Sequence, residues 1–149
     1  MTRPPVTRMK SPFRIDYTYV AGTGRSLFLH GLAQHRILAR RCPGCQQVYV
    51  PPPEFCSRCL TELGEPFGLD GAGVIQTFCV VSFPFPGQAF DPPYLVAYIQ
   101  PYGADTRLMH LVGDIEPGDV RIGMAVEPVW GDPDTSLTAI RYYRPARHA

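Results

Sequence analysis

Four of the five cysteines form two pairs whose spacing is typical of a metal site. Cys42 and Cys45 make the first Cys-x-x-Cys pair, Cys56 and Cys59 make the second, and ten residues separate the two pairs. Two intervening residues let the backbone curl so that both sulfurs of a pair face one point, and Gly44 is expected to supply a positive φ for the first curl. Four thiolates match the preference of Zn²⁺, which binds sulfur at about 2.3 Å. The sequence therefore predicts a Zn²⁺ site with these four cysteines as ligands.

The predicted site is structural and not catalytic. Four protein ligands close a tetrahedral shell, so the metal would hold the fold and leave no position for water or substrate. Three alternatives stay open: an iron centre with the same ligands, a degraded or empty site, and a redox-active dithiol. The redox interpretation is the weakest, because one pair would suffice for it and no thioredoxin-like pattern surrounds the cysteines.

No other residue pattern predicts catalysis. Cys79 stands in a β-rich run, where a thiol is expected to pack in the core as a small apolar side chain. His110 lies in another such run, and no sequence spacing pairs it with Cys79. His30 and His35 are five residues apart, so they would not stack on one face of a helix. We therefore predict no catalytic residue in this chain.

Composition limits both the size of the fold and its partners. The chain has 149 residues, 45% of them apolar, which allows one ordinary domain or two small ones. Its 17 prolines and 14 glycines favour short strands over long helices. The formal net charge of +1 gives no general attraction for nucleic acid or an anionic membrane.

The sequence also predicts where the protein works. No stretch approaches the ~18 apolar residues that span a bilayer, and the first 13 residues do not have the pattern of a signal peptide. Closely spaced cysteines that serve as metal ligands need reduced thiols. We therefore expect a cytoplasmic protein.

The order of elements predicts a mainly β fold in three parts. Residues 1–35 are expected to form an arm and a short helix over 27–35 capped by Ser26, residues 36–66 a zinc ribbon, and residues 67–149 a barrel. Within the arm, Phe13, Ile15, Tyr17 and Tyr19 alternate as in a short edge strand. The barrel strands are predicted at 74–83, 94–100, 107–112, 125–130 and 137–143. Five short strands fit the OB-fold barrel.

Two apolar groups are predicted to contact something outside the chain. One is a face of the short helix, and the other flanks a proline-rich loop over 84–93. Loops lie on the surface, and large exposed apolar patches are uncommon in monomers, so we expect an interface or a ligand contact there. The alternative is that the aromatic side chains pack on the protein itself. The predicted contact residues are Phe28, Leu32, Phe83, Phe85, Phe90 and Tyr94.

Several segments together carry a resemblance to a known family: ILARRCPGC (37–45), VYVPPP (48–53), FCSRC (55–59), GAGVIQTF (71–78), PYLVAYI (93–99) and RIGMAV (121–126). From about residue 27 to residue 144, the chain resembles the acyl-CoA-associated OB-fold proteins with an N-terminal rubredoxin-like zinc ribbon. The resemblance implies a rubredoxin-like ribbon followed by a five-stranded OB-fold barrel. It also implies a non-catalytic accessory subunit that binds a thiolase-superfamily enzyme and helps to accommodate an acyl-CoA thioester.

The partner implied by the resemblance belongs to one of several branches. It is a thiolase, a hydroxymethylglutaryl-CoA synthase, a polyketide-type acyltransferase, or a lipid-transfer-protein-like aldolase of steroid side-chain degradation. The long arm before the helix is more similar to the aldolase branch. That branch implies retro-aldol cleavage of a steroid-type side-chain acyl-CoA, done by residues of the partner.

A hypothesis of another class is binding of single-stranded nucleic acid, because zinc ribbons and OB-folds both serve that purpose. Phosphate neutralisation needs clustered positive charge. The chain offers Arg36, Arg40 and Arg41 near the cysteines, and Lys10 is its only lysine. The sequence therefore favours the accessory subunit.

Overall fold

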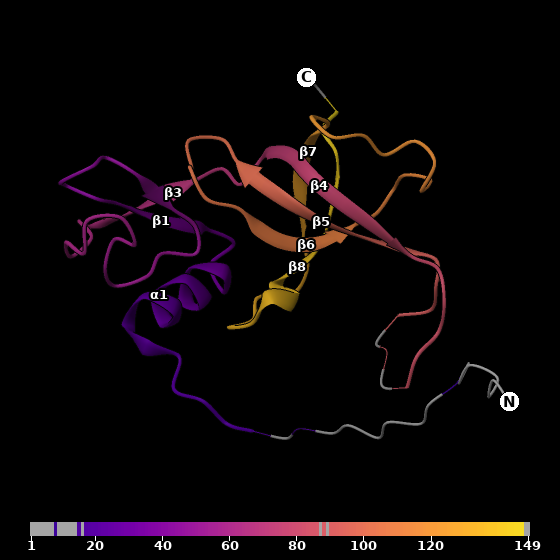
Figure 1. The fold of residues 1–149 in the computed structure, drawn as a ribbon, viewed down its shortest axis with the longest axis horizontal. Helices are drawn as coiled ribbons and strands as arrows, with labels where there is room; N and C mark the ends of the chain where they lie inside the picture. The colour runs from indigo at the N-terminus through magenta and orange to yellow at the C-terminus, as the bar shows by residue number, and fades with distance from the viewer. Residues whose placement is uncertain (1–7, 9–14, 16, 87, 89, 148–149) are drawn as a thin grey trace, which may run out of the picture.

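The computed structural model describes residues 8, 15, 17–86, 88 and 90–147, which form a small ribbon unit beside a barrel (Figure 1). The ribbon unit begins with helix α1 (Gly22–Leu32) and continues into strands β1 (Ile37–Arg41) and β2 (Val48–Tyr49). Strand β3 (Pro66–Leu69) pairs with the other side of β1, which gives a sheet of order β2-β1-β3. The helix packs against β1.

The barrel contains five strands and is closed. It is formed by β4 (Gly73–Val81), β5 (Tyr94–Pro101), β6 (Leu108–Val112), β7 (Ala125–Trp130) and β8 (Ile140–Pro145), in the order β4-β5-β6-β8-β7. Neighbouring strands are antiparallel except β6 and β8, which meet in parallel register. The predicted mainly β fold, with one helix, a cysteine ribbon and a five-stranded barrel, is confirmed.

Several predicted boundaries are wrong. The helix begins at Gly22 and not after Ser26, because the Glu54 carboxylate accepts the Thr23 N–H and caps the helix one turn earlier. The last predicted strand begins with a 3-10 turn, η1 (Leu137–Ala139), because the Ser136 hydroxyl accepts the Thr138 N–H and caps that turn. The described arm residues Ile15 and Tyr17–Val20 form no strand, and Phe13 lies outside the described residues.

One core runs through both units. Helix α1 and strand β1 contribute Phe28, Leu32 and Ile37 to the cluster that also contains Ile75 and Tyr143 of the barrel. Phe28 is 1% exposed and Leu32 is fully buried. The prediction that these two side chains contact a partner is therefore wrong, because they already cover the chain's own core.

A β-bulge decides which side chains of β4 face the interior. The pairing of β4 with β5 shifts between Ile75 and Thr77, so the alternation of faces reverses after that point. Phe78 then lies opposite the buried Ala97, whereas Cys79 is exposed on the outer face. The prediction that Cys79 packs in the core is wrong for this reason.

Strand β3 spans the predicted boundary between residues 66 and 67 and belongs to the ribbon sheet through its pairing with β1. The three-part division of the chain stays a prediction. Among the described residues, no helix is long and apolar enough to cross a bilayer.

Candidate metal centre and apolar surface

The structure brings together the four sulfurs of the predicted metal site. The Sγ atoms of Cys42, Cys45, Cys56 and Cys59 all lie within 4.8 Å of one another. The Cys42 and Cys59 sulfurs are 3.3 Å apart, and those of Cys45 and Cys56 are 3.5 Å apart. A tetrahedral metal with bonds of about 2.3 Å needs sulfur separations of roughly 3.8 Å. The donor set and its spacing therefore fit a tetrahedral thiolate-bound metal.

Each pair of cysteines is held by the same backbone pattern. The N–H of Cys42 donates to the Gln47 carbonyl and the Gln46 N–H donates back to the Cys42 carbonyl, both at 2.9 Å. In the second pair, the Cys56 N–H donates to Thr61 and the Leu60 N–H donates to Cys56. The two curls are thus equivalent turns that aim their sulfurs at a common point.

The positive φ of each curl falls just after its second cysteine, at Gln46 (φ 63°) and Leu60 (φ 56°). The expectation that Gly44 supplies it is wrong. A Cβ at Gly44 would instead lie 3.4 Å from the Cys59 sulfur. That is an ordinary van der Waals distance, so neither the backbone conformation nor the space around this position requires glycine.

The sulfur of Cys56 accepts hydrogen bonds from outside the metal site. Its Sγ lies 3.2 Å from the Tyr49 hydroxyl and 3.4 Å from the backbone nitrogen of Arg58. The hydrogen bond from Tyr49 lowers the pKa of the Cys56 thiol to about 5. A thiol that loses its proton easily is ready to bind a cation.

The site has a buried and an exposed side. Cys42 and Cys56 are buried, Cys45 is half-buried and Cys59 is exposed. With all four ligands supplied by the chain, a bound metal would tie the two curls together and supply no open coordination position.

The loop between β4 and β5 exposes aromatic side chains. Phe83 is 68% exposed, Phe85 47% and Phe90 51%. Tyr94 is half-buried, and its ring centroid lies 5.8 Å from that of Phe90. Self-packing thus joins Phe90 to Tyr94, and all three phenylalanines still remain exposed to solvent.

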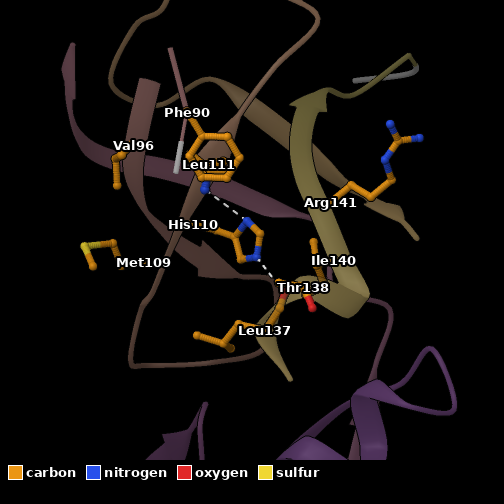
Figure 2. A pocket seen from close by; sticks show the side chains of 9 residues that line it. All are labelled: Phe90, Val96, Met109, His110, Leu111, Leu137, Thr138, Ile140 and Arg141. Atoms are coloured by element: carbon orange, nitrogen blue, oxygen red, sulfur yellow. Dashed lines mark hydrogen bonds between the residues drawn. The ribbon is translucent and has the colours of Figure 1, made fainter. Parts of the chain in front are cut away.

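An apolar hollow of about 470 Å³ lies beside this loop (Figure 2). We call it the barrel hollow. Phe90 closes one side, η1 and Ile140 form another, and Arg141 stands at the rim (Figure 2). The remaining lining comes from β5 and β6, namely Val96, Met109, His110 and Leu111. Sequence reasoning missed this site, because its residues meet only when the barrel closes.

His110 forms part of the lining with both ring nitrogens occupied. Its Nε2 lies 3.2 Å from the Leu137 carbonyl, and its Nδ1 accepts the Leu111 N–H at 2.9 Å (Figure 2). An acceptor Nδ1 and a donor Nε2 describe the neutral ring. Burial lowers its pKa, which favours the same form. His110 lies opposite Ala97, whereas Cys79 lies opposite Val96 on the other face of β5, so the two do not form a dyad.

Comparison with known proteins first gives the class. Residues 29–63 match the family model "ChsH2, rubredoxin-like zinc ribbon domain", and residues 68–131 match "ChsH2, C-terminal OB-fold domain". Together with the cysteine cluster and the closed barrel, these matches define a zinc-ribbon OB-fold protein.

The chain belongs to the DUF35 family. It is 33% identical over 103 residues to the "DUF35 domain-containing scaffold protein" of Methanocaldococcus jannaschii, and the match covers 68% of this chain and 72% of that one. It is 32% identical over 113 residues to the "Probable enoyl-CoA hydratase alpha subunit" of Thermomonospora curvata. That match covers 76% of this chain and only 34% of the relative, which is a longer protein. The family resemblance seen in the sequence is confirmed.

Solved structures are similar over most of the chain. The "Ltp2-ChsH2(DUF35) aldolase" superimposes with a TM-score of 0.64 at 26% identity and covers 81% of this chain and 93% of that one. A DUF35 protein of unknown function from Sulfolobus solfataricus superimposes with a TM-score of 0.63 at 18% identity, covering 83% and 84%. The second likeness speaks for the fold alone.

Proposed function

We propose that this chain is a non-catalytic accessory subunit that binds a thiolase-superfamily enzyme acting on acyl-CoA thioesters. The observation that carries the proposal is the loop between β4 and β5, where Phe83, Phe85 and Phe90 remain exposed and Phe90 also lines the barrel hollow. Several large apolar side chains exposed in one loop are typical of an interaction site. Homology to a protein named as a scaffold and to one solved with an aldolase agrees with it.

Chemistry at the described residues supports a subunit without turnover of its own. A metal held by four cysteines has no position for water. Among the described residues, the strand partner of Cys79 is Val96, which is no base, and both ring nitrogens of His110 are hydrogen-bonded to backbone groups. The bonds that react would therefore be handled by residues of the partner.

For the reaction, we propose retro-aldol cleavage of a steroid-type side-chain acyl-CoA. Its support is the likeness to the aldolase structure over most of both chains. The alternatives are a thiolase, hydroxymethylglutaryl-CoA synthase or acyltransferase complex, and the enoyl-CoA hydratase name of one relative adds a hydratase complex. The barrel hollow, with apolar walls and Arg141 at its rim, would contact the acyl-CoA or the partner.

We further propose that the resident metal is Zn²⁺ and that the protein works in the cytoplasm. The name of the matched ribbon domain and the four-sulfur donor set support zinc. Cysteines that serve as metal ligands are typical of a compartment that keeps thiols reduced, which supports the cytoplasm.

Co-purification tests the partner and its interface together. The tagged chain is co-expressed with thiolase-superfamily proteins of the same genome, and we expect one of them to be retained in stoichiometric amount. Phe85→Asp with Phe90→Asp should abolish that retention and the acyl-CoA activity of the complex while leaving the metal content unchanged. Ile122→Asp is the matched control, because Ile122 is 67% exposed and does not line the barrel hollow. If no thiolase-superfamily protein is retained, the proposed function is wrong. If the double variant retains the partner as well as the Ile122→Asp control does, the proposed partner is supported but the loop is not the interface.

A further inference from the structure

We propose that Tyr49 is a positioning residue of the metal centre: its hydroxyl donates a hydrogen bond to the metal-bound Cys56 thiolate and thereby strengthens the grip of the ribbon on its metal. This inference concerns the metal centre and does not depend on which partner the chain binds.

The fold delivers the Tyr49 side chain to the metal site from the sheet. Tyr49 is the last residue of strand β2, which follows the first cysteine curl. Strand β2 pairs with β1, the strand that directly precedes this curl. The side chain is 5% exposed and packs in a small cluster with Cys42, Cys56 and Leu63. Its hydroxyl oxygen lies 3.2 Å from the Cys56 sulfur. A buried tyrosine needs a partner for its hydroxyl, and here that partner is a metal ligand.

The donors and acceptors around the Tyr49 hydroxyl determine the direction of its hydrogen bond with the Cys56 sulfur. The backbone N–H of Ser57 donates to the Tyr49 oxygen at 3.2 Å, and the Ser57 hydroxyl lies 3.0 Å from the same oxygen. A thiolate bound to a metal carries no proton and can only accept. The single proton of the Tyr49 hydroxyl therefore points at the sulfur, and the Ser57 hydroxyl donates to the remaining lone pair of Tyr49.

Electrostatics explains what the bond does. Four thiolates around a divalent cation leave an excess of two negative charges, and hydrogen bonds to the sulfurs spread that charge. Cys56 receives two such donors, the Tyr49 hydroxyl and the Arg58 N–H. Removing an outer-shell partner of a metal ligand typically weakens metal affinity by about 10- to 100-fold. The bond also lowers the energy of the sulfur lone pairs, so its loss should lower the energy of a sulfur-to-metal charge-transfer transition.

The test removes one hydroxyl group from the side chain of Tyr49. Tyr49→Phe keeps the buried ring and removes only the hydroxyl. In competition with a chelator, we expect the full-length variant to hold Zn²⁺ about 10-fold more weakly or worse than the original chain. In the Co²⁺-substituted protein, the thiolate-to-cobalt charge-transfer band should move to longer wavelength. Ser57→Ala is the matched control, since it leaves the Tyr49 donor in place and should leave the band nearly unchanged.

Other results would overturn the proposal. An unchanged band and an unchanged Zn²⁺ affinity in Tyr49→Phe would do so, and so would lower thermal stability with an unchanged band, because a purely packing role gives that result. If Tyr49→Phe does not fold, the original chain loaded with ¹¹³Cd gives the answer by NMR. We then expect the Tyr49 hydroxyl proton to exchange slowly and to show scalar coupling to the metal. A rapidly exchanging, uncoupled hydroxyl would refute the bond.

Discussion

Glu54 Oε1 accepts the backbone N–H of Thr23 at 2.9 Å, so a residue of the ribbon caps the first turn of a helix 31 positions earlier in the chain. The helix has no side-chain cap of its own, because Ala21 stands at the capping position. Free N–H groups of a first turn need acceptors, and a carboxylate also complements the positive end of the helix dipole. The cap thus fastens the start of α1 to the segment that precedes the second cysteine pair.

Loss of this carboxylate should loosen the start of α1. In Glu54→Ala, we expect the amides at residues 22–25 to exchange with solvent faster, as measured by hydrogen–deuterium exchange, with metal content unchanged. Hydrogen bonds from Thr23 lower the pKa of Glu54, so the protection is present above the ordinary glutamate pKa and is lost as pH falls through the lowered value. Glu65→Ala is the control, since Glu65 is exposed and outside this contact. Equal exchange in the two variants would contradict the prediction.

Metal content should depend on the four clustered cysteines and not on Cys79. Protein purified without chelator should contain one equivalent of zinc by elemental analysis. Cys45→Ser should lose metal and solubility, because three thiolates leave the site incomplete. Cys79→Ser should keep its metal and change the free energy of unfolding by no more than about 0.5 kcal/mol, because Cys79 is exposed. Less than about a tenth of an equivalent of zinc and iron together would refute the site.

Acid should destabilise the barrel through His110. Burial lowers its pKa, so the unfolded chain takes up the imidazole proton before the folded chain does. Stability is therefore complete above the ordinary pKa of about 6.5 and falls as pH drops below it. Urea unfolding between pH 8 and pH 5.5 should show a smaller pH dependence in His110→Gln than in the original chain. Parallel stability curves would show that His110 titrates normally in the fold.

A methyl group has no room at Gly73 of strand β4. A Cβ at Gly73 would overlap the carbonyl oxygen of Gln100 and lie 2.7 Å from the Cα of Pro101, both of which are backbone atoms. We expect Gly73→Ala to cost about 3 kcal/mol of unfolding free energy or to prevent folding. Gly118→Ala is the matched control, because a Cβ there meets nothing within 4 Å. Similar melting temperatures for the two variants would show that β4 and β5 can separate at this point.

Local patterns predict the parts of this protein that depend on local chemistry. The two Cys-x-x-Cys spacings predict the ligand set Cys42, Cys45, Cys56 and Cys59, because each curl is built from neighbouring residues and four thiolates match one metal. The barrel strands follow from short β-rich runs between turns. The sequence does not predict strand β3, because proline and glycine occupy two of its four positions. Only its pairing with β1 makes it a strand.

Long-range packing explains why some predictions from the sequence were wrong and why the barrel hollow was not predicted. The apolar face of α1 is the same in sequence whether it covers its own core or a partner, and only the fold shows that Phe28 and Leu32 are buried within the chain. The exposure of Cys79 depends on a bulge between Ile75 and Thr77 that has no sequence signal of its own. The barrel hollow requires β5, β6 and η1 to meet, so no single segment contains its pattern.

The shared core of the ribbon and the barrel has a consequence for how such proteins diversify. Phe28 and Ile37 from the ribbon side pack in one cluster with Ile75 and Tyr143 of the barrel. Neither half can be exchanged for an unrelated one without exposing this cluster. We therefore expect the ribbon and the barrel to be inherited together as one unit. The match to the longer Thermomonospora curvata protein covers 76% of this chain and therefore includes parts of both halves, as this expectation requires.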